Sequence, residues 1–73
     1  MYKWLDYTLE VNGKKYDHTF QAISPEAVVR QEMNWFGFGA VFTVTDENGK
    51  ISKFRKIKTS DAVTGYADIE KIL

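Results

Sequence analysis

Apolar and polar residues alternate along the first third of the chain in a pattern that predicts a β-hairpin. The alternation runs through residues 3–11 and again through 14–22, and Asn12-Gly13 between them is a strong signal for a two-residue turn. Pairing Val11 with Lys14 places these residues on one side: Leu5, Tyr7, Leu9, Tyr16, His18 and Phe20. The other side carries Trp4, Asp6, Thr8, Glu10, Lys15, Asp17, Thr19 and Gln21. Because a slip of one residue would mix the two sets, the pattern fixes the predicted register.

A helix is predicted over residues 25–35. Ser24-Pro25-Glu26 supplies an N-cap serine, a proline at the first helical position and an acid in the first turn. Three residues at helical spacing predict a stripe that faces the core: Val29, Met33 and Phe36. Gly37 and Gly39 predict the end of the helix and leave Phe38 on the loop that follows.

A second hairpin is predicted after the helix. Residues 40–45 are rich in β-formers, and the turn Asp46-Glu47-Asn48-Gly49 suits a type I turn followed by a glycine bulge. The predicted core-side pairs are Phe42 with Phe54 and Val44 with Ser52. The reverse side holds Val41, Thr43, Thr45, Ile51, Lys53, Arg55 and Ile57. Because the strand over residues 50–58 is rich in lysine, we expect it at an edge of the sheet.

The tail over residues 59–73 fits two structures. Ile69, Ile72 and Leu73 favour a short helix, while Gly65-Tyr66-Ala67 begins a strand in the alternative. Together the elements predict an α+β fold in the order β-β-α-β-β. It has a mainly antiparallel four-stranded sheet, one helix packed on one face, and a short C-terminal helix or strand. A β-grasp has the same element order and is the alternative, with its fourth strand beside the first at the sheet centre.

Composition and charge narrow the class of protein. The 73 residues, 44% of them hydrophobic and 15% aromatic, predict a single compact domain over residues 1–73. There is no cysteine, so neither disulfides nor thiolate metal sites are available. Residues 1–6 have no signal-peptide apolar region and no stretch reaches membrane-spanning length, so we expect a cytoplasmic protein that does not associate with membranes.

No catalytic or cofactor-binding constellation is evident in the sequence. His18 is the only histidine and is expected to pack on the core side opposite Tyr7, without the partners that a triad or a zinc site needs. Asp6, Glu10 and Asp17 share the outer side of the first hairpin and could form an acid pair. The facing of Glu10 and Lys15 favours a cross-strand ion pair instead. We therefore expect no enzyme, no metal and no cofactor.

The side of the sheet that the helix leaves uncovered points to protein binding. It combines tryptophan, aliphatic residues and arginine, a composition typical of interaction surfaces. We expect a non-enzymatic protein-binding or inhibitory module with these binding residues: Trp4, Ile51, Lys53, Arg55, Lys56, Ile57 and Lys58.

The net charge of the chain is zero, but half of its positive charge lies on residues 50–58. This concentration of charge suggests a first alternative to protein binding. This is direct nucleic-acid binding through Lys50, Lys53, Arg55, Lys56 and Lys58, in which the lysines contact phosphates. A second alternative is a small structural domain in which these lysines only protect a sheet edge.

The layout of residues 20–58 carries a resemblance. The order of a strand, Ala22-Ile23-Ser24-Pro25-Glu26-Ala27, a helix, glycine and a hairpin is similar to that in many small phage- and plasmid-encoded proteins. It resembles a type I-F anti-CRISPR, a small sheet-plus-helix inhibitor that binds a Cas effector complex. The resemblance covers about half of the chain and carries over no functional residue. It implies a stoichiometric binder of a host nucleic-acid-handling complex.

Two tendencies bear on assembly. The aliphatic residues Val41, Ile51 and Ile57 favour face-to-face association, whereas opposed cations on residues 50–58 disfavour pairing of that strand with a second copy. We expect a monomer or a weak dimer through the sheet face.

Overall fold

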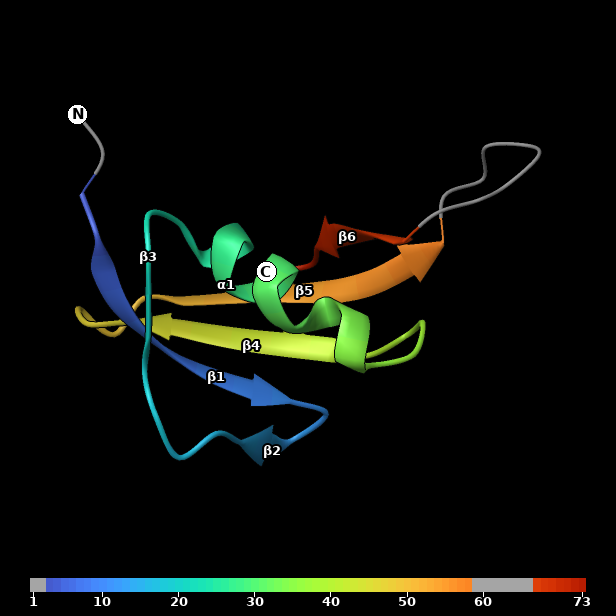
Figure 1. The fold of residues 1–73 in the computed structure, drawn as a ribbon, viewed down its shortest axis with the longest axis horizontal. Coiled ribbons are helices and arrows are strands. Elements are labelled where there is room, and N and C mark those ends of the chain that lie inside the picture. The colour runs from blue at the N-terminus through green and yellow to red at the C-terminus, as the bar shows by residue number, and fades with distance from the viewer. Residues whose placement is uncertain (1–2, 59–66) are drawn as a thin grey trace.

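The computed structural model describes residues 3–58 and 67–73. The elements within these ranges are β1 (Leu5–Val11), β2 (Lys14–Lys15), β3 (Phe20–Ala22), α1 (Pro25–Glu32), the 3-10 turn η1 (Met33–Trp35), β4 (Val41–Asp46), β5 (Ile51–Lys58) and β6 (Ala67–Lys71). The helix and the turn that continues it lie across one face of an antiparallel sheet (Figure 1). This arrangement confirms the predicted α+β class.

The strands lie in the order β2-β1-β4-β5-β6, and β3 also pairs with β1. Every pairing is antiparallel. Within the described residues the sheet has six strands instead of four, because the second strand of the first hairpin is divided into β2 and β3 and the tail adds β6. Since β1 lies beside β4 and not beside β5, the order differs from that of the β-grasp alternative.

The prediction that residues 50–58 form an edge strand is wrong. β5 pairs with β4 on one side and with β6 on the other. A central strand tolerates this composition because two of its cations have partners within the fold. Lys56 donates hydrogen bonds to the end of the helix, and Arg55 lies 3.6 Å from the carboxylate of Glu70 on β6. The edge on this side of the sheet is β6.

The favoured helix in the tail is also wrong where the structure describes it, because residues 67–71 form β6. The remainder of that segment, residues 59–66, lies outside the described residues. The backbone of β5 provides the physical reason, since a strand at this position satisfies groups that a helix would leave without partners. Past the end of β6, Ile72 N donates to Lys53 O at 2.8 Å, and Lys53 N donates to Leu73 O at 3.0 Å.

The first hairpin has the predicted register at its turn and a different one farther away. Val11 pairs with Lys14, and the φ angles of 52° at Asn12 and 85° at Gly13 fit the predicted turn. Tyr7 pairs with Phe20 instead of the predicted His18, a shift of two residues. The bulge that separates β2 from β3 accounts for the shift. Because the shift is even, each side of the hairpin keeps its apolar or polar character.

The helix begins as predicted. The Ser24 hydroxyl accepts a hydrogen bond from Ala27 N at 3.2 Å, and Pro25 takes the first helical position. The α-helix ends at Glu32, and η1 extends it to the predicted last residue, Trp35. All three predicted stripe residues pack in or against the core: Val29, Met33 and Phe36.

The second hairpin confirms the predicted pairs, Phe42 with Phe54 and Val44 with Ser52. Its turn is held by Asp46, whose side-chain Oδ1 accepts hydrogen bonds from the backbone N of Asn48 and of Lys50, both at 2.9 Å. The buried core between the sheet and the helix consists of Tyr7, Leu9, Val11, Ala22, Val28, Val29, Met33, Ala40, Phe42, Val44 and Phe54. Burial of each large side chain contributes about 1.5–3 kcal/mol, so this cluster is the main source of stability.

Candidate functional site

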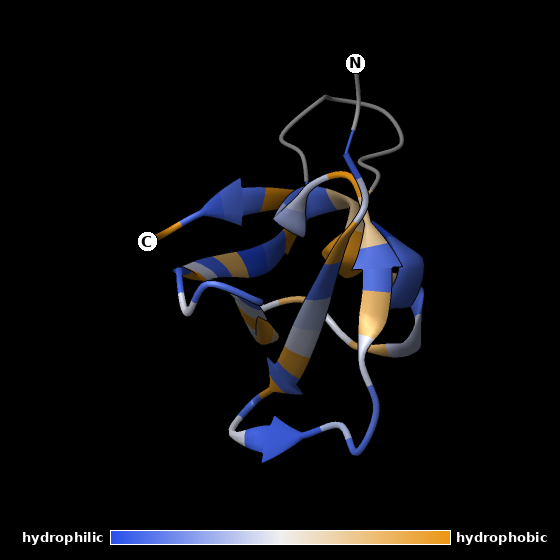
Figure 2. Ribbon diagram, turned by 90° about the vertical axis from the view of Figure 1, so that its left-hand side faces the viewer, coloured by the Kyte–Doolittle hydropathy of each residue, from blue (hydrophilic) through white to orange (hydrophobic). Residues whose placement is uncertain are grey.

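The sheet has one face under the helix and one face that no described element covers. Apolar and polar residues alternate along the strands (Figure 2). We call the uncovered side the open face and define it by the strand positions that alternate with the buried ones: Asp6, Thr8, Glu10, Val41, Thr43, Thr45, Ile51, Lys53, Arg55 and Ile57. This is the side on which the sequence predicted a binding surface.

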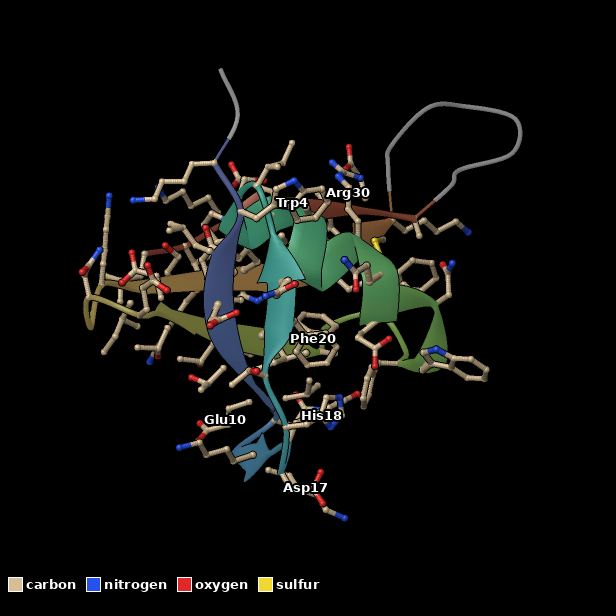
Figure 3. The ribbon with its side chains drawn as sticks, turned by 60° about the vertical axis from the view of Figure 1, so that its left-hand side comes forward. Trp4, Glu10, Asp17, His18, Phe20 and Arg30 are labelled. Atoms are coloured by element: carbon tan, nitrogen blue, oxygen red, sulfur yellow. The ribbon has the colours of Figure 1, made fainter. Side chains whose placement is uncertain are left out.

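Four of the predicted binding residues lie on the open face: Ile51, Lys53, Arg55 and Ile57. Trp4 is 67% exposed just before β1, and Ile51 is 49% exposed at the start of β5. Arg55 is exposed, while Lys53 and Ile57 are half-buried. Trp4 lies at the end of the molecule where β1 begins, away from Glu10 (Figure 3), whereas the other four side chains extend from β5. The structure thus presents these side chains from paired strands.

Charges on the open face lie close to opposite charges. Glu10 pairs with Lys15 on β2 and with Thr43 on β4, and Thr43 pairs in turn with Lys53. Arg55 forms an ion pair with Glu70 at 3.6 Å. Such a row of alternating charges gives the face no strong potential of either sign. The apolar side chains and arginine are therefore its distinctive feature.

Lys56 does not belong to this surface, which corrects its assignment as a binding residue. It lies on the helix side of β5 and is only 8% exposed. Its ammonium Nζ donates to Met33 O at 2.9 Å and to Phe36 O at 2.7 Å, and it lies 5.2 Å from the centroid of the Phe38 ring. A cation at the carbonyl end of a helix interacts favourably with the helix dipole. Lys56 thus has a structural role.

The other cations of residues 50–58 are also divided between the two faces. Lys58 follows Lys56 on the helix side of the alternation and is exposed. Lys50 lines a small polar hollow with Tyr7 and Ser52, which are also on the helix side. Lys53 and Arg55 remain on the open face. The five cations therefore do not form the single basic stripe that the nucleic-acid alternative assumed.

His18 and Asp17 differ from their predicted places. They lie on the bulge between β2 and β3 (Figure 3). The His18 side chain is 59% exposed, and its Nδ1 lies 3.2 Å from Asp17 Oδ1. His18 is therefore not packed opposite Tyr7. Glu10 faces Lys15, the pairing that the sequence favoured over an acid pair with Asp17. Among the residues that the structure describes, no three His, Cys, Asp or Glu side chains are grouped so as to hold a metal ion.

Two exposed aromatic residues were not among the predicted binding residues. Trp35 ends η1 and is 79% exposed, and Phe38 on the following loop is 57% exposed. One signal was available in the sequence, because Trp35 lies outside the helical stripe of Val29, Met33 and Phe36. Nothing in the sequence indicated that Lys56 would hold this loop.

A groove of about 480 Å³ opens beside Phe36 at the first hairpin. Its walls are Val11, Lys14, Lys15, Tyr16, Asp17 and Phe36. Burial, followed by the nearby carboxylate of Glu32, raises the pKa of Tyr16 above its ordinary value of 10.0. The Tyr16 hydroxyl therefore stays protonated at neutral pH and offers the groove a neutral polar group.

No family model, curated protein or solved structure matches this chain. Among the described residues, no helix is both long enough and apolar enough to cross a membrane.

Proposed function

We propose that this chain is a non-enzymatic protein-binding module that contacts its partner through the open face. The observation that carries the proposal is that Ile51, 49% exposed, shares the open face with the exposed Arg55, while Trp4, 67% exposed, lies just before β1. Tryptophan and arginine are the residues most enriched among those that dominate binding energy in protein interfaces. Because they extend from or adjoin paired strands, little conformational entropy is lost when a partner binds.

The class of partner rests on the layout resemblance of residues 20–58 alone. On that basis we propose that the module inhibits a nucleic-acid-handling complex of the host of a phage or mobile element. The same resemblance implies that the module binds stoichiometrically. The inhibitory role and the source are separate from the surface assignment, and the experiment below tests the surface alone.

The surface is tested by placing a photo-crosslinking amino acid at Thr43, in the middle of the open face. A matched control carries it at Gln31, an exposed position on the helix. We expect one protein from the host cells to crosslink from Thr43 and not from Gln31. Trp4→Ala or Arg55→Glu should abolish that product while circular dichroism and the melting temperature stay near those of the parent protein.

Two results would refute the assignment to the open face. One is crosslinking to the same protein from Gln31 and Thr43 with equal yield. The other is full retention of the product in both Trp4→Ala and Arg55→Glu. In Arg55→Glu the new carboxylate would lie beside Glu70 and could lower stability by charge repulsion. Arg55→Met, which removes the charge without adding an acid, serves as the second variant in that case.

A further inference from the structure

Three segments far apart in the sequence meet at one end of the sheet. They are the β1–β2 turn, the loop over residues 36–40 and the C-terminal end of β5, all at the same end in Figure 1. Backbone hydrogen bonds hold them together, since Asn12 N donates to Val41 O at 2.9 Å and Gly39 N donates to Lys56 O at 2.8 Å. The end of the molecule is thus a fixed surface.

Two aromatic rings are presented there in a held geometry. Trp35 is 79% exposed and Phe38 is 57% exposed. The ammonium of Lys56 lies 5.2 Å from the Phe38 ring centroid and also bonds the carbonyls of Met33 and Phe36, which fixes the loop. A Cβ at Gly37 would meet nothing within 4 Å, so the space beside Gly37 is open. Neither exposed ring contributes to the buried core.

Three lysines lie on strands that reach this end of the sheet. Lys14 and Lys15 line the groove beside Phe36, and Lys58 ends β5 two residues beyond the contact between Lys56 and Gly39. None of the ion pairs within residues 3–58 and 67–73 includes these three lysines. The acid that lines the groove, Asp17, is in contact with His18, and Lys15 faces Glu10 across the two strands. We call this set the aromatic–lysine end: Lys14, Lys15, Trp35, Phe36, Phe38 and Lys58.

We propose that the aromatic–lysine end binds single-stranded nucleic acid. Exposed rings stack on unpaired bases whatever their sequence, and lysines contact phosphates as point charges. In the sheet order β2-β1-β4-β5, the strands that carry the lysines lie three positions apart, about 14–15 Å, a span that one short strand of nucleic acid covers. An acidic peptide would match the lysines and leave the ring faces without a flat partner. A duplex keeps its bases stacked away from the rings.

Trp35 provides a direct probe of this binding. The chain has two tryptophans, so Trp4→Phe leaves Trp35 as the single fluorophore. Titration of this full-length variant with a twelve-residue oligothymidylate at low salt should quench the Trp35 emission. Contacts from three lysines predict a log–log salt slope of about −2, which is roughly fourfold weaker binding for each doubling of salt. Loss of the second ring in Phe38→Ala should weaken binding at least about fivefold.

Matched variants separate the site from general electrostatics. Lys14→Gln and Lys58→Gln should each weaken binding and reduce the slope by about 0.7. Lys50→Gln and Lys53→Gln, which lie outside the aromatic–lysine end, should do neither. The proposal is overturned by an absence of quenching at low salt, by equal affinity for a duplex of the same length, or by equal competition from polyglutamate. The nucleic-acid site does not include the residues that define the open face. Failure of the nucleic-acid proposal would therefore leave the proposed protein-binding function standing, and failure of that function would leave the nucleic-acid proposal standing.

Discussion

At the scale of single residues, Lys56 shows how much can be predicted from alternation and where prediction stops. Its position two residues after Phe54 already assigns it to the helix side of β5. That it reaches the carbonyls of Met33 and Phe36 depends on how the helix crosses the sheet, which no local pattern specifies. The lysine-rich composition of the strand therefore suggested a solvated residue, although Lys56 is among the most buried polar residues described.

Replacing Lys56 should be costly. Lys56→Met keeps most of the side-chain volume but leaves the carbonyls of Met33 and Phe36 without donors, and an unsatisfied buried polar group costs about 1–3 kcal/mol. We expect the free energy of unfolding, measured by urea denaturation, to fall by that order. Lys58→Met, at an exposed position on the same strand, should change it by no more than about 0.5 kcal/mol. Equal stability of the two variants would contradict the structural role of Lys56.

The tyrosine in the core predicts how stability responds to high pH. Burial, followed by the charge of Asp46, raises the pKa of Tyr7 above 10.0. Below pH 10.0 Tyr7 is protonated in both the folded and the unfolded chain, so its full contribution to stability is present. Above that pH the unfolded chain ionises first, and stability is lost as the pH rises towards the folded pKa. Tyr7→Phe removes this term.

The measurement compares melting temperatures near pH 9 and pH 11, conditions on either side of the ordinary tyrosine pKa of about 10. We expect the drop between them to be smaller in Tyr7→Phe than in the parent protein. The drop should not vanish, because the pKa of Tyr16 is also raised and lysines lose charge in the same range. Identical drops in the two proteins would show that Tyr7 does not titrate differently on folding.

At the scale of elements, turns and caps that depend on neighbouring residues could be predicted from the sequence, whereas pairings between distant elements could not. The turn at Asn12-Gly13, the cap at Ser24 and the turn at 46–49 each depend on a few neighbouring residues, and the structure has all three. β6 depends instead on the free side of β5, and the bulge near His18 depends on where β3 meets β1. The open face could be predicted from the alternation of apolar and polar residues. The conformation of the exposed aromatic loop could not, because it depends on a contact with Lys56, which is distant in the sequence.

Two glycines, one in the second hairpin turn and one in the loop after the helix, allow a paired test. Gly49 closes the second turn with φ of 85°, a left-handed conformation that costs a residue with a Cβ about 1–2 kcal/mol. Gly37 has no such φ, and a Cβ there meets nothing within 4 Å. Thermal unfolding should therefore show Gly49→Ala to be less stable than the parent. Gly37→Ala should be unchanged or more stable by about 0.4–1 kcal/mol. A similar loss in both variants would mean that the turn conformation is not the cause.

At the scale of the whole molecule, β6 determines whether the sheet can extend into a second copy. Among the strands of residues 3–58 and 67–73 it is an edge strand, and none of them pairs with its outer backbone groups. Antiparallel self-pairing centred on Ile69 would place Asp68 of each copy opposite Glu70 of the other. Directly opposed like charges destabilise such a pair, and this arrangement would create two such oppositions. Within each copy the same acids are used internally, by Arg30 at 3.0 Å and by Arg55 at 3.6 Å.

We therefore expect a monomer in light scattering over a wide range of protein concentration. Asp68→Asn combined with Glu70→Gln removes the opposed charges and should raise self-association. The matched control, Asp17→Asn with Glu47→Gln, changes the net charge equally at exposed positions away from β6 and should remain monomeric. Because both pairs shift the net charge by the same amount, a difference between them isolates the position of the charge from its quantity. A parent protein that dimerises through β6, or two double variants that behave alike, would show that these acids do not protect the edge.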